Sequence, residues 1–215
     1  MKRKTITFVT IFLLLVLALI SALWLGGPPR KPAVISPGDY SYTIEYAEYR
    51  IPKLMDQKHL PSLAVALVED QTVIWQETFG LANLEKEQPA ESDTVYRLWS
   101  VAKVFTAIET LHLVEDGLVE LDAPITDYIP GFVIQSRYPD PGQITIRSLL
   151  THRSGLPRNG CQWIELNPNL LADLVTSLED CYQTYPVGYY YKYSNAGFDL
   201  LGYLIEEKRG VPFPD

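Results

Sequence analysis

Two residues near the middle of the chain have the types and spacing of a nucleophile and its base. Ser100 and Lys103 form a Ser-x-x-Lys motif at the start of a segment with helical periodicity. Residues three apart on a helix face the same side, so the ammonium can reach the hydroxyl. A serine hydroxyl is a poor nucleophile until a base takes its proton, and the helix N-terminus adds N–H groups suited to an oxyanion. The motif alone is weak, because about one chance match is expected at this length; the plainer interpretation is a capping serine beside a solvated lysine.

A second motif, Tyr193-x-Asn195, lies on the approach to the last predicted helix. A phenol has a pKa of about 10 and responds to a nearby cation, so Tyr193 can share proton transfer with Lys103. The Asn195 amide offers both a donor and an acceptor, which suits it to hold the lysine and to bind a substrate amide. The alternative interpretation is structural: Tyr193 packs a loop with its neighbouring tyrosines, and Asn195 caps a helix.

Other reaction classes have less support in the sequence. The sequence contains no Gly-x-Ser-x-Gly motif, which forms the nucleophile elbow of other serine hydrolases. His152 and Ser154 are close in sequence, but no such elbow lies beside them. Neither His-Glu-x-x-His nor Cys-x-x-Cys occurs, so neither a metal nor a cofactor is expected. The formal net charge of −8 argues against nucleic acid as a partner, since phosphate binding needs clustered Lys and Arg. We expect a small-molecule or peptide substrate instead.

Apolar periodicity predicts one helix, then a β-hairpin, then a mostly helical stretch. The first helix covers residues 43–58, and the hairpin joins residues 63–68 to residues 72–79. A loop at residues 85–93 and a short strand at residues 94–98 are expected next. Later helices are predicted at residues 100–117, 144–151, 170–178 and 198–207. In the helix after Ser100, the apolar spacing falls on Val104, Ala107, Ile108, Leu111 and Val114.

The first forty residues have the character of a membrane anchor and a spacer. Residues 1–5 are basic, and residues 6–25 are uncharged and apolar, long enough to span the roughly 30 Å hydrocarbon core. A cleaved signal peptide is the alternative, but the segment lacks an Ala-x-Ala exit. Residues 26–39 form a Pro/Gly-rich linker. We therefore expect a single-pass membrane protein with a short cytoplasmic N-terminus and an extracytoplasmic domain over residues 40–215.

The chain has two cysteines, Cys161 and Cys181. Outside the cytoplasm a disulfide between them is permitted, and it would stabilise the fold by roughly 3 kcal/mol. Two buried free thiols are the alternative.

Several segments in register resemble the serine β-lactamase-related family, which includes class C β-lactamases, D-Ala-D-Ala carboxypeptidases and penicillin-binding proteins. The resemblance begins near Tyr40 and runs to Asp215. Besides the segment around Ser100 and Lys103, it rests on residues 113–124, on residues 144–157 (ITIRSLLTHRSGLP) and on residues 193–202 (YSNAGFDLLG). This agreement in order outweighs the weakness of each motif taken alone.

The resemblance implies an α+β fold of the β-lactamase/transpeptidase type, in which an antiparallel sheet carries an inserted helical lobe. It implies that Ser100 is acylated, that Lys103 and Tyr193 activate it, and that Asn195 helps to bind substrate. His152 is then structural. Trp99 is a departure, because a small residue commonly precedes the serine. The family's third motif, a Lys or His followed by Ser or Thr and then Gly, occurs nowhere in the chain, so the domain is expected to be incomplete at its C-terminus.

These observations favour a serine acyl hydrolase that acts through a Ser100 acyl-enzyme on an amide or ester: a β-lactam, a D-amino-acid peptide or an ester. A membrane-tethered penicillin-binding sensor is one alternative, since domains with this motif can be acylated without useful turnover. A truncated, inactive homologue is another, since the third motif is absent. The residues do not distinguish the three substrate types and do not fix the oligomeric state.

Overall fold

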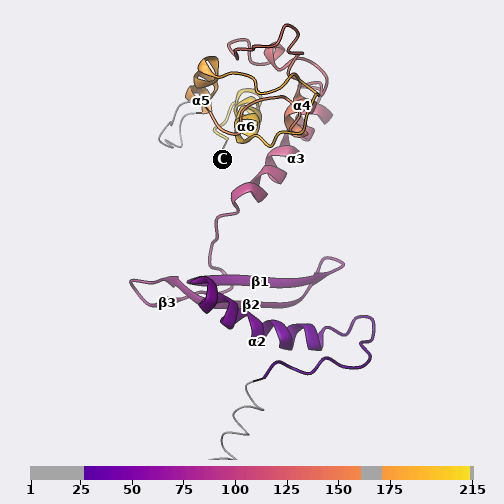
Figure 1. Cartoon of the computed structure of the whole chain (residues 1–215), viewed down its shortest axis with the longest axis vertical. Coiled ribbons are helices and arrows are strands. Elements are labelled where there is room, and N and C mark those ends of the chain that lie inside the picture. The colour runs from indigo at the N-terminus through magenta and orange to yellow at the C-terminus, as the bar shows by residue number, and fades with distance from the viewer. Residues whose placement is uncertain (1–26, 161–170, 214–215) are drawn as a thin grey trace, which may run out of the picture. The chain divides into compact units, whose positions relative to one another are not determined.

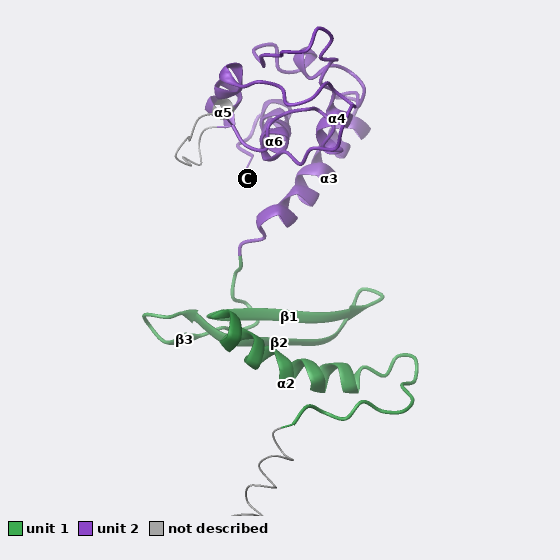
Figure 2. Cartoon of the chain, viewed as in Figure 1, with its two compact units in different colours: residues 1–96 green, residues 97–215 purple. Residues whose placement is uncertain are grey.

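The chain folds into two compact units, Met1–Tyr96 and Arg97–Asp215, coloured separately in Figure 2. The structure, a computed structural model, describes residues 27–160 and 171–213. The predicted anchor at residues 6–25 lies outside the described residues. Among the residues that are described, no helix is both long and apolar enough to cross a membrane.

From residue 27 onward, the described part of the first unit consists of one helix and a small antiparallel sheet (Figure 1). Helix α2 (Ser41–Lys58) continues through Pro52 and ends at His59, which adopts a left-handed conformation. Strands β1 (Ser62–Glu69) and β2 (Thr72–Asn83) form the predicted hairpin. Asp70 and Gln71 both have positive φ at its two-residue turn, which matches the right-handed twist of the paired strands.

The region after the hairpin differs from the sequence prediction in two ways. Strand β2 runs on to Asn83, and the short strand β3 (Gln88–Pro89) pairs with its end, inside the stretch that was predicted to be a loop. The short strand predicted at residues 94–98 is wrong: these residues belong to no strand. Their β-forming side chains favour a strand only where a neighbouring strand gives them packing, and the Val95 side chain is 94 % exposed.

The second unit is helical and contains every candidate site residue. Its nucleophile segment comprises the 3-10 turn η1 (Trp99–Val101) and helix α3 (Ala102–Glu115). Shorter elements follow, and then the long helix α6 (Asn195–Arg209). The shorter elements are η2 (Ile125–Asp127), α4 (Ile146–Leu150), α5 (Leu171–Ser177) and η3 (Leu178–Asp180). All four helices predicted after Ser100 are therefore present (Figure 1).

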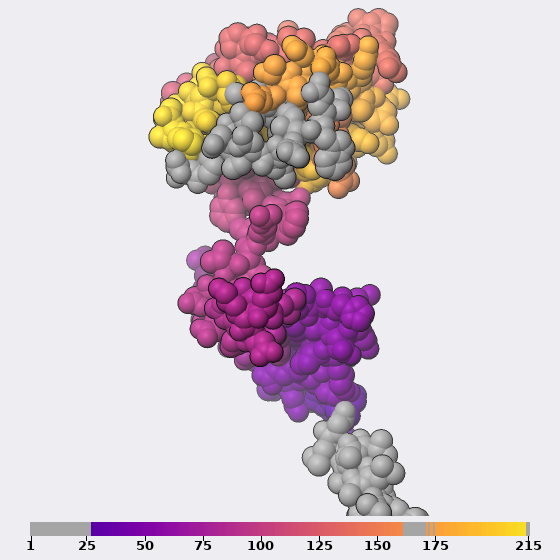
Figure 3. Space-filling model, turned by 90° about the vertical axis from the view of Figure 1, so that its left-hand side faces the viewer, coloured from indigo at the N-terminus to yellow at the C-terminus, as the bar shows by residue number. Residues whose placement is uncertain are grey.

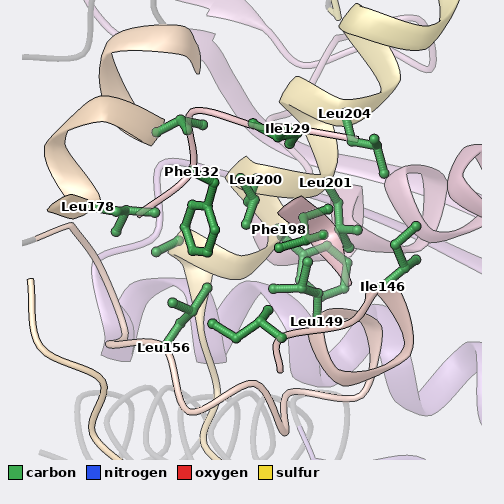
Figure 4. Close-up of a cluster of buried hydrophobic side chains, with 14 of the residues drawn as sticks. Ile129, Phe132, Ile146, Leu149, Leu156, Leu178, Phe198, Leu200, Leu201 and Leu204 are labelled. Atoms are coloured by element: carbon green, nitrogen blue, oxygen red, sulfur yellow. The ribbon is translucent and has the colours of Figure 1, made fainter. Parts of the chain in front are cut away.

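Helix α6 lies at the centre of this unit, and α3, α4 and α5 each pack against it. One face of α6 is buried from Ala196 to Ile205, and Leu200, Leu201 and Leu204 are fully enclosed. Side chains from α4 and from the connecting loops complete the cluster, among them Leu149, Leu156 and Phe132 (Figure 4). This continuous core fixes the start of α6, where Tyr193 and Asn195 lie.

Helix α3 buries a face that only partly overlaps its predicted apolar stripe, of which Ala107 and Val114 pack against the core. Thr106, Thr110 and Leu113 are buried, whereas Val104 and Ile108 are about half exposed. The helix is apolar on most of its circumference, so periodicity could not select a face. The buried Thr110 hydroxyl is satisfied because it donates to the Thr106 carbonyl oxygen at 2.7 Å. The exposed first half of α3 is visible in pink on the surface of this unit (Figure 3).

Cys181 is fully buried and disulfide-bonded. The chain's other cysteine, Cys161, lies outside the described residues.

Candidate active site

Ser100 lies in the 3-10 turn directly before α3, where its side chain is exposed. The residue before it, Trp99, has a φ of +48° and an indole that is 80 % exposed. A left-handed conformation is unfavourable for a residue with a large side chain, which gives a physical reason why a small residue suits this position. The turn therefore presents the Ser100 hydroxyl on the surface, at the end of a helix whose partial positive charge favours a developing anion.

The Tyr193 hydroxyl donates a hydrogen bond to Ser100 Oγ at 2.8 Å, although the two residues are 93 positions apart in the chain. This contact joins the start of α3 to the segment that leads into α6. The two motifs that sequence analysis singled out separately therefore form one site. A proton can pass between the two oxygens without any rearrangement, because they are already within hydrogen-bond reach.

Lys103 is in the first turn of α3 and is half-buried against two aromatic rings. Its Nζ atom lies 5.3 Å from the centroid of the Tyr193 ring and 5.7 Å from that of Phe198. An ammonium over an aromatic face is attracted by the ring quadrupole. The lysine is thus held beside the oxygen pair of Ser100 and Tyr193, with its charge facing the phenol.

The environment favours ionisation of Tyr193. The hydrogen bond with Ser100 and the nearby charges of Lys103 and Arg158 lower the pKa of the phenol below its ordinary value of 10.0, although partial burial opposes them. The guanidinium carbon of Arg158 lies 5.6 Å from the ring centroid. Because only the phenolate can accept the Ser100 proton, the lowered pKa raises the fraction of Tyr193 that is able to act as the base.

Asn195 is the first residue of α6, and its amide bonds to a residue outside the two motifs. Its Nδ2 donates to the Asn159 side-chain oxygen at 2.8 Å. The helix is capped by Ser194, whose hydroxyl accepts a hydrogen bond from the Gly197 N–H, so the alternative in which Asn195 caps the helix is wrong. The structure therefore places Asn195 beside the other three residues without a direct contact to Ser100 or Lys103 among the interactions of the described residues.

The start of α6 is tied to the loop after α4 by buried hydrogen bonds. The Ser194 hydroxyl donates to the Pro157 carbonyl oxygen at 2.7 Å, and the Ser194 N–H donates to His152 Nδ1 at 3.2 Å. The Asn195 N–H donates to the Arg158 carbonyl oxygen at 2.6 Å. These bonds fix the backbone that directly follows Tyr193.

His152 supports the site from behind, in agreement with the structural role expected for it. Its ring packs against Tyr193 at 4.5 Å and Phe198 at 5.0 Å between centroids, and its carbonyl oxygen accepts from the Lys192 N–H. Burial and then the charge of Lys103 lower the pKa of His152 below 6.5. A neutral ring is what the bond from Ser194 to Nδ1 requires, since that nitrogen acts as an acceptor.

The loop that carries His152 is itself held in place by close packing. Gly155 has a φ of +74°, and a Cβ atom there would lie 1.9 Å from the Tyr185 carbonyl oxygen. The Gly155 carbonyl oxygen accepts hydrogen bonds from both the N–H and the hydroxyl of Thr184. Glycine at this position thus lets the loop dock closely enough to position His152 and Pro157.

Sequence reasoning missed three residues that the structure brings into the site: Arg158, Asn159 and Asp199. Arg158 and Asn159 directly follow the segment at residues 144–157 that carried the resemblance, and their polar character after an apolar loop was the available signal. Asp199 is a charged residue inside the apolar run of α6, which was the signal there. Within the described part of the chain, no group of His, Cys, Asp and Glu side chains could hold a metal ion.

The beta-lactamase family matches residues 48–215. An unguisins hydrolase of Aspergillus campestris is 30 % identical over 173 residues, which cover 77 % of this chain and 32 % of that protein. Esterase EstB of Burkholderia gladioli is 29 % identical over 199 residues, which cover 84 % of this chain and 50 % of that protein. The octameric penicillin-binding protein homologue from Pyrococcus abyssi superposes with a TM-score of 0.69 at 27 % identity, covering 79 % of this chain and 40 % of that one. The chain thus spans between about a third and half of the length of these relatives.

Proposed function

The chain belongs to the beta-lactamase family of serine hydrolases, with its α+β fold, and on that premise we propose that it is a serine acyl hydrolase that works through a Ser100 acyl-enzyme. The 2.8 Å hydrogen bond between Tyr193 and Ser100, with Lys103 beside both, is the observation that carries the proposal. The names of the similar proteins, a hydrolase and an esterase, support an amide or an ester as the substrate.

The first step forms the acyl-enzyme. Ionised Tyr193 takes the proton of the Ser100 hydroxyl, and Oγ forms a bond to the substrate's carbonyl carbon, which becomes tetrahedral. Lys103 stabilises the tyrosine anion before the transfer and the negative charge that develops on the substrate after it. The bond to the leaving group then breaks, and that group takes the proton from Tyr193. The carbonyl re-forms as a Ser100 ester.

The second step repeats the first with water in place of the serine. Tyr193 takes a proton from a water molecule, whose oxygen attacks the ester carbonyl, and Ser100 Oγ leaves and recovers a proton from Tyr193. The same residue thus acts as a base and then as an acid in each half, which general acid–base catalysis requires of a single group close to the nucleophile. The rate of hydrolysis relative to the rate of acylation decides whether the protein turns over or stays acylated.

Labelling with a fluorescent fluorophosphonate tests this proposal, because the reagent reacts covalently only with an activated hydroxyl. We expect the full chain to be labelled and the Ser100→Ala variant to lose the label. Ser92→Ala is the matched control, since Ser92 is an exposed serine of the first unit, and it should label like the wild type. Equal labelling of the Ser100→Ala variant and the wild type would overturn the proposal.

We also propose that residues 6–25 anchor the protein in a membrane with the hydrolase domain outside the cytoplasm. The uncharged apolar run supports this, and so does the disulfide at Cys181, because disulfides persist mainly in oxidising compartments. Removal of residues 1–26 should release the protein from the membrane fraction in alkaline carbonate, whereas the full chain should stay in it. Full release of the intact chain would contradict an anchor.

A further inference from the structure

A run of three tyrosines, Tyr189, Tyr190 and Tyr191, lies shortly before Tyr193 in the chain, and the proposed reaction does not use it. The three side chains are 74 %, 60 % and 55 % exposed, respectively. Single exposed apolar side chains are ordinary on a protein surface, but a contiguous group of them marks an interaction site. The arrangement of these rings therefore bears on what the protein binds.

Two of the three rings lie against a further tyrosine, Tyr185, which is half-buried. The rings of Tyr185 and Tyr189 are stacked, with centroids 6.3 Å apart and planes 23° from parallel. The rings of Tyr185 and Tyr190 lie 5.7 Å apart with their planes tilted by 44°. Tyr185, Tyr189 and Tyr190 thus form one aromatic surface, which we call the tyrosine platform.

Hydrogen bonds hold the tyrosine run at both of its ends. The Gly188 N–H donates to the Arg153 carbonyl oxygen at 2.8 Å, and the Lys192 N–H donates to the His152 carbonyl oxygen at 2.8 Å. Both acceptors belong to the loop after α4, so the run is fixed to the same loop that supports the site. A tyrosine side chain has only two χ angles and loses little conformational freedom when it binds a ligand. The platform is therefore suited to binding.

The platform adjoins the candidate active site. The Tyr191 ring meets the His152 ring edge to face at 5.7 Å, and the His152 ring packs on Tyr193, whose hydroxyl bonds to Ser100. Tyr190 precedes Tyr193 by three residues, so the backbone between them spans at most about 11 Å. The platform is thus within reach of a substrate whose carbonyl group lies at Ser100.

Charges beside the platform select among the ligands that stack on tyrosine rings. The Arg153 guanidinium donates to the Gly188 carbonyl oxygen at 3.5 Å, and Lys192 follows the run directly. Both side chains are positive and repel a cationic ligand, which would otherwise suit a set of aromatic faces. An uncharged aromatic ring avoids this repulsion, and its pairing with a tyrosine ring is favourable beyond the area that it buries.

We propose that the tyrosine platform is a substrate subsite that binds an uncharged aromatic group of the compound that acylates Ser100. The inference rests on the proposed function and deepens it, because it names the substrate class: an amide or ester with an aromatic side group. We assign that group to the acyl part, which stays attached to Ser100 through both steps.

Two thioesters of the same small alkyl thiol test the subsite in the full chain. Their acyl groups, phenylpentanoyl and cyclohexylpentanoyl, differ in whether the terminal ring is aromatic, and thiol release gives kcat/KM for each. We expect the double variant Tyr189→Leu, Tyr190→Leu to lower the aromatic-to-saturated ratio of kcat/KM by about two- to tenfold, the usual contribution of an aromatic pair. This ratio does not depend on how much of each preparation is folded.

Two further variants show whether the rings of the platform are responsible. Tyr189→Phe, Tyr190→Phe keeps both rings and should keep the wild-type ratio. Tyr182→Leu is the matched control: the Tyr182 ring belongs to the same unit but faces the Arg137 guanidinium, at 4.3 Å from the centroid, and its loss should not change the ratio. An unchanged ratio in the double leucine variant would overturn the proposal, and so would an equal fall in Tyr182→Leu.

A binding measurement separates this inference from the proposed function. Saturation-transfer NMR of phenylpentanamide with the Ser100→Ala variant does not require acylation. Its ring signal should fall by at least about half when Tyr189→Leu and Tyr190→Leu are added. If neither thioester is cleaved but this fall is seen, the proposed function fails and the subsite stands. If Ser100 reacts but neither the ratio nor the NMR signal depends on the platform, the subsite fails and the proposed function stands.

Discussion

The starts of α3 and α6 meet at the site, but they are built in opposite ways. The start of α6 is buried and tied down: Ser194 is 1 % exposed, caps the helix and bonds to the loop after α4. The start of α3 has no side-chain cap, and Trp99, Ser100 and Val101 are all exposed. A hydrogen bond from Tyr193 to Ser100 links it to the second motif.

The contrast between the two helix starts indicates which side of the site is preformed. Tyr193 is held by the backbone bonds of Ser194 and by the ring of His152, so its hydroxyl has a fixed position. The Ser100 side is exposed, and its hydroxyl accepts a hydrogen bond from Tyr193. Fixed electrostatic groups cost no reorganisation during the reaction, which is an advantage for the side that stabilises charge. The nucleophile needs access to substrate, which exposure provides.

The largest expected effect is the loss of chemistry without loss of stability when the hydrogen bond between the two helix starts is removed. Tyr193→Phe removes the hydroxyl that bonds to Ser100 and should slow fluorophosphonate labelling by roughly 10²-fold or more, the usual contribution of a general base. Stopped-flow or quenched labelling gives the rate. Because the ring and its packing against His152 remain, urea unfolding should change little. A labelling rate within a factor of three of the wild type would remove Tyr193 from its assigned role.

The second prediction concerns the α6 side, where stability should suffer. Ser194→Ala removes a helix cap and leaves the Pro157 carbonyl oxygen without its partner, so the free energy of unfolding should fall by about 1–3 kcal/mol. Ser100→Ala is the matched change on the α3 side and should lie within about 0.5 kcal/mol of the wild type, because Ser100 is exposed. Equal losses in the two variants would contradict the contrast between the two helix starts.

The smallest expected effect is at Trp99. Its left-handed conformation costs about 1–2 kcal/mol, and glycine avoids this cost while it adds flexibility to the unfolded chain. Trp99→Gly should therefore raise the free energy of unfolding slightly, by about 0.5 kcal/mol. Val101→Gly, at a right-handed φ of −64°, should lower it by about 0.5–1 kcal/mol. Thermal unfolding of both variants checks the opposite signs.

The sequence predicted which segments form helices and strands better than it predicted which face of each helix is buried. The hairpin, the long first helix and the helix that begins near Tyr193 follow from periodicity and turn residues, which are local properties. The buried face of α3 does not, because apolar residues surround that helix and only its packing on α6 selects Thr106, Thr110 and Leu113. The strand expected at residues 94–98 failed for the same reason, since strand formation depends on a partner.

For the site, the two motifs identified Ser100, Lys103 and Tyr193, which the structure brings together. The partners that hold them were not predictable, because they come from the distant loop after α4. The Asn195 amide illustrates this: its residue type suits contact with lysine, yet the position of Asn159 directs it elsewhere.

Mapping the covalent adduct by peptide mass spectrometry tests the central claim most directly. The full chain would be treated briefly with a fluorophosphonate at neutral pH, digested, and searched for modified serine, tyrosine and lysine residues. We expect one adduct per chain, on Ser100, with the exposed Ser92 unmodified. An adduct on another residue, or an even spread over exposed serines, would contradict the claim that Tyr193 and Lys103 activate Ser100.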